Sequence, residues 1–224
     1  MKRRELLVAL AAGALAEGAT RLAQGSEAQY TNEIALPKPS ITGTVSLEEA
    51  IEKRRSVRNF APKPLPVEAI GQLLWAGQGI TNPDNGRRAA PSAGALYPLE
   101  LYVVTAAEVM HYLPQGHRAQ TRATHDLRPE LRALAVNQRS VEEAPALLVV
   151  AAEPSRLTER YGARANLYAD LEVGHATQNM LLQAVTLGLV AVTVGAVDGA
   201  PAARKLALPH GQTVVYLIPV GYPA

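Results

Sequence analysis

One long, largely apolar stretch dominates the sequence. Residues 166–187 have the pattern of a single helix with apolar side chains on most of its sides. Such a helix is stable in water only when other elements cover it, so we expect it at the centre of the core. Apolar runs before and after it, Ala146–Ala152, Val190–Val197 and Val214–Val220, have the length and composition of strands. The pattern predicts strands packed around a central helix.

The earlier part of the sequence also contains both expected helices and expected strands. Ser46-Leu47-Glu48-Glu49 is a capping box, which predicts a helix that runs into Arg54-Arg55. Val67–Ala76 predicts a second helix and Leu99–Thr105 a strand. No strand is followed by the GxGxxG fingerprint of dinucleotide-binding folds. Few strands and long helices favour an α+β fold over a doubly wound sheet, and 224 residues suit one sizeable domain.

The N-terminal segment differs from the rest. Residues 1–25 carry Lys2-Arg3-Arg4, a modest apolar run and an Ala14-x-Ala16 cleavage pattern, which resembles a twin-arginine export signal. The apolar run is short for a bilayer, so we expect export without stable membrane insertion once the signal is removed. The alternative is a cytoplasmic protein with an Ala/Leu-rich N-terminal helix. Residues 26–45 are polar and proline-containing, typical of an extended arm or linker, and residues 46–224 form the domain.

Charge and cysteine content exclude several classes of protein. The formal net charge is +2, too small to indicate a nucleic-acid partner. Cysteine is absent, which excludes disulfides, thiolate zinc sites, iron–sulfur clusters and a cysteine nucleophile. We expect no metal centre.

Three segments carry the candidate chemistry. The first is Arg54-Arg55-Ser56-Val57-Arg58, where three guanidinium groups and a hydroxyl group make a dense set of anion donors. The second is the loop from Pro91 through Ser92, Ala93 and Gly94, whose small residues allow a flat ligand to approach the backbone. The third is Val194-Gly195, at the end of an expected strand. Each alone has an ordinary structural interpretation, such as basic residues at a helix C-terminus.

Together these segments resemble the nitroreductase family of FMN enzymes, and the branch of SagB-type dehydrogenases most closely. The resemblance covers residues from about 46 to the end and rests on these motifs: Arg54–Phe60, Pro91–Glu100, Asn137-Gln138, Ala144-Pro145, Glu172-x-Gly174-His175-x-x-Gln178-Asn179, Leu187-Gly188-Leu189, Val194-Gly195 and Pro219–Pro223. It implies a nitroreductase-like fold, with a central mixed or antiparallel sheet flanked by helices, in an intertwined homodimer.

The resemblance also implies roles for individual residues. Residues matching the phosphate and ribityl positions are Arg54, Ser56 and Arg58, with Arg55 beside them. Those matching the loop on the isoalloxazine ring, usually contributed by the partner subunit, are Pro91, Ser92, Ala93 and Gly94. Asn137 or Gln138 matches a polar contact to the pyrimidine side of the ring, and Val194 and Gly195 match the backbone near N5.

Two further features leave alternatives open. Glu172 and His175 share a helix face, either as an acid–base pair, with His175 as proton donor, or as packing or interface residues. Family members commonly continue past the Gly-Tyr-Pro segment to a basic residue that meets the phosphate. This sequence ends at Ala224, and Arg204 and Lys205 are the upstream residues that would replace that contact.

The implied activity is an FMN-dependent oxidoreductase with a ping-pong cycle. NAD(P)H reduces FMN at N5 and leaves, and a nitroaromatic, quinone or similar small-molecule acceptor then takes the hydride; no side chain need act as a base. One alternative is a SagB-type dehydrogenase that oxidises azoline rings in a peptide. Others are a non-catalytic flavin-binding protein and a structural protein whose arginines pair with acidic neighbours.

Overall fold

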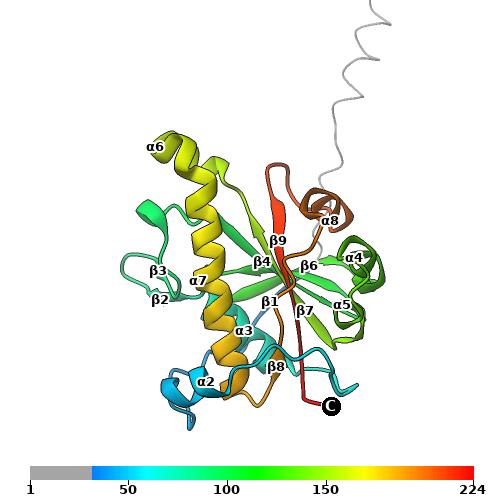
Figure 1. Ribbon diagram of the computed structural model, residues 1–224. Helices are drawn as coiled ribbons and strands as arrows, with labels where there is room; N and C mark the ends of the chain where they lie inside the picture. The colour runs from blue at the N-terminus through cyan, green and yellow to red at the C-terminus, as the bar shows by residue number, and fades with distance from the viewer. Residues whose placement is uncertain (1–31) are drawn as a thin grey trace, which may run out of the picture. The chain divides into compact units, whose positions relative to one another are not determined.

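The computed structural model describes residues 32–224, so the export-signal-like segment expected over residues 1–25 lies outside the described residues. A seven-stranded sheet organises this part of the chain, in the order β1-β6-β5-β4-β7-β9-β8 (Figure 1). Its strands are β1 (Glu33–Ala35), β4 (Leu99–Thr105), β5 (Val109–Leu113), β6 (Arg118–Ala123), β7 (Ala146–Ala152), β8 (Val190–Ala191) and β9 (Thr213–Gly221). All neighbouring strands pair antiparallel. A hairpin of β2 (Ile80–Asn82) and β3 (Arg87–Arg88) stands apart.

Helices cover both faces of the sheet (Figure 1). The helices are α2 (Leu47–Lys53), α3 (Val67–Gln78), α4 (Arg128–Leu134), α5 (Arg139–Glu143), α6 (Ser155–Tyr161), α7 (Ala165–Thr186) and α8 (Gly199–Lys205), with 3-10 turns η1 (Ala93–Ala95) and η2 (Gly162–Arg164). One face packs against α3 and α7, and the other packs against α4, α5 and α8. The expected α+β sandwich is confirmed, and the sheet is antiparallel throughout.

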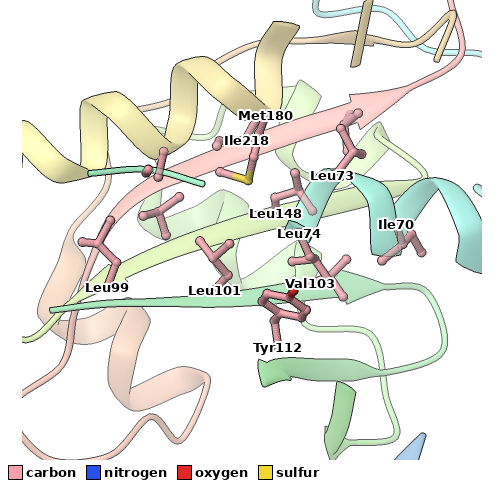
Figure 2. Close-up of a cluster of buried hydrophobic side chains, with 14 of the residues drawn as sticks. Ile70, Leu73, Leu74, Leu99, Leu101, Val103, Tyr112, Leu148, Met180 and Ile218 are labelled. Carbon is pink, nitrogen blue, oxygen red and sulfur yellow. The ribbon is translucent and has the colours of Figure 1, made fainter. Parts of the chain in front are cut away.

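The core on the α3 and α7 face follows from the alternation of side chains along the strands. Leu99, Leu101 and Val103 of β4 point toward α3 and α7, where Figure 2 shows them below Met180. Tyr102 and Val104 point to the opposite face. Strand β7 is buried on both faces, which explains why residues 146–152 form an uninterrupted apolar run.

The central helix is only partly enclosed. Its inner side packs on the sheet through Met180, and a Cβ atom at Gly77 of α3 would lie 3.0 Å from the Met180 sulfur atom. The outer side exposes Leu167 and Leu171, which are 51% and 50% accessible to solvent. Within residues 32–224 the central helix is therefore buried on its inner side only.

Most predicted elements are confirmed, with one clear exception. The strands predicted at Leu99–Thr105 and Ala146–Ala152 have these bounds in β4 and β7. The strand predicted over Val190–Val197 is wrong beyond Ala191, because only β8 and an isolated bridge at Val194 pair with β9. Pro219 of β9 accepts the Val192 N–H at 3.2 Å but has no N–H to return, and the ladder stops there.

The described part of the expected arm, residues 32–45, lies along the domain. Strand β1 adds to the sheet edge at β6, and Leu36 beyond it is buried. The backbone N–H and carbonyl oxygen of Ser40 both bond to the Gln72 amide, at 2.8 and 3.0 Å. At the start of α2, the Ser46 hydroxyl group accepts the Glu49 N–H at 3.1 Å, which is the first half of the predicted capping box. The segment is extended, and these contacts attach it to the domain.

Candidate functional site

The arginine segment lies beside the end of the sheet that carries β8. Arg54 leaves α2 with extended backbone angles (φ −56°, ψ 121°). The Val57 N–H then donates to the Ala191 carbonyl oxygen at 3.1 Å, and the Ala61 N–H donates to the Tyr222 carbonyl oxygen at 3.0 Å. These backbone bonds hold residues 54–61 against β8 and the final residues of the chain.

The donors of this segment are largely unpaired. Among residues 32–224, the guanidinium groups of Arg54 and Arg58 and the hydroxyl group of Ser56 form no hydrogen bond or ion pair. Arg55 differs, because its Nη1 donates to the carbonyl oxygens of Glu52 and Arg54 at 2.6 and 2.8 Å. Arg55 therefore caps α2, while its three neighbours remain available to an anion.

A hollow of about 430 Å³ opens beside Arg58. Its lining residues are Arg58, Asn59, Gln138, Arg139, Ser140 and Glu143. Of the predicted pair at 137–138, only Gln138 lines it. Asn137 is exposed, in a left-handed conformation (φ +56°), and its backbone groups bond to Arg132. The structure thus places Gln138, and not Asn137, next to the arginine segment.

Ser140 is a residue of this hollow that the sequence did not indicate. It is 4% exposed, and its hydroxyl group has no hydrogen-bond partner among residues 32–224. A buried hydroxyl group without a partner costs free energy, and each such group in a native protein calls for an explanation. A polar ligand in the hollow would satisfy it. The group therefore fits a cofactor with several hydroxyl and carbonyl oxygens.

Val194 and Gly195 continue from β8 along β9. Val194 is buried and exchanges two backbone bonds with Leu217, at 2.8 and 3.1 Å. Gly195 is exposed, and a Cβ atom there would lie 2.9 Å from the Tyr216 ring. The contact with Tyr216 therefore requires a glycine at 195. The two residues lie three and four positions beyond Ala191, which meets the arginine segment.

The Pro91–Gly94 loop lies elsewhere, against α7. The Ala93 N–H donates to Glu172 Oε1 at 2.8 Å, and Ser92 Oγ accepts the Tyr97 N–H at 2.8 Å. The Ser92 hydroxyl group also faces the Glu172 carboxylate and lowers its pKa. A hollow of about 250 Å³ lies here, lined by Pro91, Ser92, Ala93, Tyr168, Leu171, Glu172 and His175.

Glu172 carries an unusual charge environment. It is 4% exposed, and burial raises its pKa above the ordinary value, although the Ala93 N–H, the Ser92 hydroxyl group and nearby His175 and Arg88 act in the opposite direction. His175 is exposed and lines the same hollow. The predicted juxtaposition of Glu172 and His175 on one face of α7 is present.

Most of the candidate site residues thus lie in two places within one chain. We use the name arginine cluster for Arg54, Ser56 and Arg58 of the arginine segment together with Gln138 and Ser140, which line the hollow beside Arg58. The loop cluster consists of Pro91, Ser92, Ala93, Gly94, Glu172 and His175. The two hollows share no lining residue. In Figure 1 the arginine segment follows α2 at the C-terminal end of α7, whereas the Gly94 region contacts Arg160 and Tyr161 near the other end of that helix.

The two upstream basic residues lie away from the arginine cluster. Arg204 and Lys205 are exposed in the last turn of α8, and Gly199 at the start of α8 touches Val214 at the start of β9. The arginine segment meets the end of β9. A strand rises about 3.3 Å per residue, so the start and the end of β9 lie roughly 20 Å apart. The structure does not bring Arg204 and Lys205 to the arginine cluster.

Residues 32–224 lack two kinds of feature. That part of the chain contains no grouping of three or more histidine, aspartate or glutamate side chains suited to a metal ion. It also contains no helix that is both long enough and apolar enough to cross a bilayer.

Comparison with known proteins identifies the class and then the family. A structure from Ralstonia eutropha in the nitroreductase group superposes with a TM-score of 0.79 at 27% identity, covering 88% of this chain and 91% of that chain. The nitroreductase homologue MJ1384 of Methanocaldococcus jannaschii is 39% identical over 172 residues, covering 74% of this chain and 85% of its own length. Fold and relatives define an α+β oxidoreductase. The model of the nitroreductase family matches residues 51–222, and the chain belongs to that family.

A related branch also matches. The microcin B17-processing protein McbC of Escherichia coli is 27% identical over 177 residues, which are 72% of this chain. The chain spans 65% of the length of McbC.

Proposed function

We propose that the protein is an FMN-dependent oxidoreductase that transfers hydride from NAD(P)H to a small acceptor such as a nitroaromatic or a quinone. The observation that carries the proposal is the set of unpaired donors in the arginine cluster, next to a hollow that contains Gln138 and the orphaned Ser140 hydroxyl group. Bound FMN would supply the hydride chemistry at ring atom N5. The chain's own residues bind and orient it.

The arginine cluster suits a phosphate group. Two guanidinium groups and one hydroxyl group are free to donate to phosphate oxygens, and charge-assisted bonds of this kind are strong. A purely structural role would require acidic partners for Arg54 and Arg58, and residues 32–224 supply none. Gln138 and Ser140 would meet polar atoms further along the cofactor.

The separation of the two clusters supports a homodimer. One chain alone has no loop cluster at its arginine cluster, whereas a second copy can supply it. The exposed Leu167 and Leu171 on α7 give an apolar surface for such a contact, and Leu171 also lines the loop hollow. We therefore propose that each flavin site combines the arginine cluster of one protomer with the loop cluster of its partner.

His175 is the candidate proton donor of this composite site. It is exposed and adjoins the Pro91–Gly94 loop, so the loop of one protomer would carry it to the acceptor side of the partner's flavin. Hydride transfer itself needs no side-chain base.

For the N-terminal segment we propose export through a twin-arginine-like signal, with a cytoplasmic protein as the alternative. Fractionation of cells expressing wild type and an Arg3→Lys/Arg4→Lys variant separates the two.

Purification and anaerobic titration test the function. We expect a yellow protein whose flavin absorbance bleaches with NADH or NADPH and returns with a nitroaromatic or a quinone. A colourless protein that takes up no added FMN would contradict the proposal. Bound FMN that neither nicotinamide reduces would instead indicate a non-catalytic flavin-binding protein.

The similarity to McbC favours one second candidate, a dehydrogenase that oxidises azoline rings in a peptide. That reaction runs in the opposite direction with respect to the flavin, so an azoline peptide would bleach the flavin without any nicotinamide. Mass spectrometry would then show a loss of two hydrogen atoms from the peptide ring.

A further inference from the structure

The Pro91–Gly94 loop depends on one side chain of α7. The carboxylate of Glu172 accepts the Ala93 N–H at 2.8 Å and also bonds to the Ser92 hydroxyl group. Ala93 and Glu172 are 79 residues apart in the sequence. Within residues 32–224, no other side chain from outside the loop hydrogen-bonds to residues 91–95. Glu172 is therefore the loop's one polar anchor there.

The backbone of the loop needs such an anchor. Gly94 and Ala95 have positive φ angles, of +61° and +55°. An alanine is strained in this conformation, which persists only where the surroundings hold it. The turn's own bonds, from Ala95 N–H to the Ser92 carbonyl oxygen and from Leu96 N–H to the Ala93 carbonyl oxygen, do not fix its position on α7.

Among residues 32–224, the carboxylate itself has no cationic partner in direct contact. The charged and titratable groups that face it are His175 and Tyr168 of α7 and, at longer range, Arg88 of β3. The guanidinium group of Arg88 is engaged with Gln78 at 2.9 Å and with the Tyr97 ring. The buried charge is thus stabilised chiefly by the two donors of the loop.

We infer that Glu172 is a positioning residue whose buried carboxylate holds the Pro91–Gly94 loop in the conformation that the flavin site requires. The inference rests on the proposed function for its effect on FMN. Without this carboxylate the Ala93 N–H loses its acceptor, and residues 91–95 keep only the bonds within their own turn.

Removal of this contact should lower the affinity for FMN, because the loop is then no longer held in place. Loosening of the loop should precede any global unfolding, because it breaks only the contact with α7.

The experiment compares wild type with Glu172→Gln, Glu172→Ala and the matched control Asp170→Asn, an exposed acidic residue on the same helix. Two quantities are measured at neutral pH: the hydrogen-exchange protection factor of the Ala93 amide in flavin-free protein, and the Kd for FMN. Asp170→Asn keeps the wild-type values. Glu172→Gln still offers an acceptor to Ala93 and retains most of the protection and of the affinity. Glu172→Ala loses about tenfold in each, as expected for one strong hydrogen bond.

The outcomes separate the two proposals. Wild-type protein that binds no FMN contradicts the proposed function, while the protection of Ala93 still reports on Glu172. Wild-type protection of Ala93 and wild-type FMN affinity in Glu172→Ala overturn the positioning role. Losses in Glu172→Gln as large as those in Glu172→Ala overturn it as well, because Gln still offers an acceptor. Glu172→Leu keeps the volume without an acceptor and repeats the comparison where Glu172→Ala does not fold.

Discussion

The Nε2 atom of His117 lies 3.1 Å from the carbonyl oxygen of Pro37, while its Nδ1 atom lies 2.9 Å from the Tyr112 hydroxyl oxygen. A carbonyl oxygen only accepts, so Nε2 must donate and Nδ1 accepts from Tyr112. The neutral ring satisfies both bonds. It joins the arm at Pro37 to the β5–β6 hairpin, next to the backbone bond from the Leu36 N–H to the His117 carbonyl oxygen.

We predict that this contact makes the stability depend on pH. Burial lowers the pKa of His117 below its ordinary value of 6.5. Between the folded and the unfolded pKa, the unfolded chain binds more protons, so the free energy of unfolding rises with pH up to about 6.5. Urea denaturation of His117→Gln should lack this rise. The control is His210→Gln, at an exposed histidine, and an equal slope in both variants would contradict the prediction.

Removal of the arginine cluster's cations should abolish FMN retention. Each charge-assisted hydrogen bond is worth about 1.5 to 3 kcal/mol, so Arg54→Ala/Arg58→Ala should weaken FMN binding by at least roughly 100-fold. The matched control is Arg204→Ala/Lys205→Ala, which removes the same charge from α8. Fluorescence titration of the flavin-free proteins gives both constants. Undiminished flavin content in the first variant would overturn the site assignment.

Ser140→Ala should separate cofactor binding from stability. The hydroxyl group has no partner in the described part of the chain, so its loss should leave the free energy of unfolding unchanged or raise it by up to about 1 kcal/mol. FMN binding should weaken by about fivefold, the value of one hydrogen bond. Thr177→Val removes the other orphaned hydroxyl group, which lies on α7 across the sheet, and should leave FMN binding unchanged. Equal Kd values for all three proteins would contradict the role of Ser140.

A charge on the outer side of α7 should break the proposed homodimer. Leu171→Glu places a carboxylate on the apolar surface, where burial without a partner is costly. Sedimentation velocity should show a monomer that retains little FMN, because the loop cluster no longer reaches the partner. Ile41→Glu changes an exposed apolar residue outside α7 and serves as the control. A flavin-loaded monomer would show instead that one chain builds the whole site.

The sequence predicts those helices and strands whose structure depends on the pattern of their own residues. Strand β7 could be predicted because both of its faces are buried, and α3 because its apolar face repeats at helical spacing. Strand β6 was not predicted, because Arg118–Ala123 lies near the sheet edge and carries mostly polar side chains. The end of β8 depends on Pro219 in a strand that follows much later, and no local pattern reports such a contact.

The candidate site likewise contains parts that the sequence indicates and parts that only the structure reveals. The arginine segment and the Pro91–Gly94 loop are contiguous motifs, so the sequence could indicate them. No pattern in the sequence marks Ser140, because its burial without a hydrogen-bond partner depends on tertiary packing. Glu172 and Ala93 meet only through tertiary packing across 79 residues. Which of Asn137 and Gln138 faces the hollow likewise depends on the left-handed turn at Asn137.

The separation of the two clusters within one chain has a genetic consequence. In the proposed homodimer, a mutation in the arginine cluster and a mutation in the loop cluster damage different halves of each site. Co-expression of two such mutant genes yields mixed dimers in which one site combines both defects and the other combines both intact halves. The two classes of allele should therefore complement each other, whereas two alleles within one cluster should not.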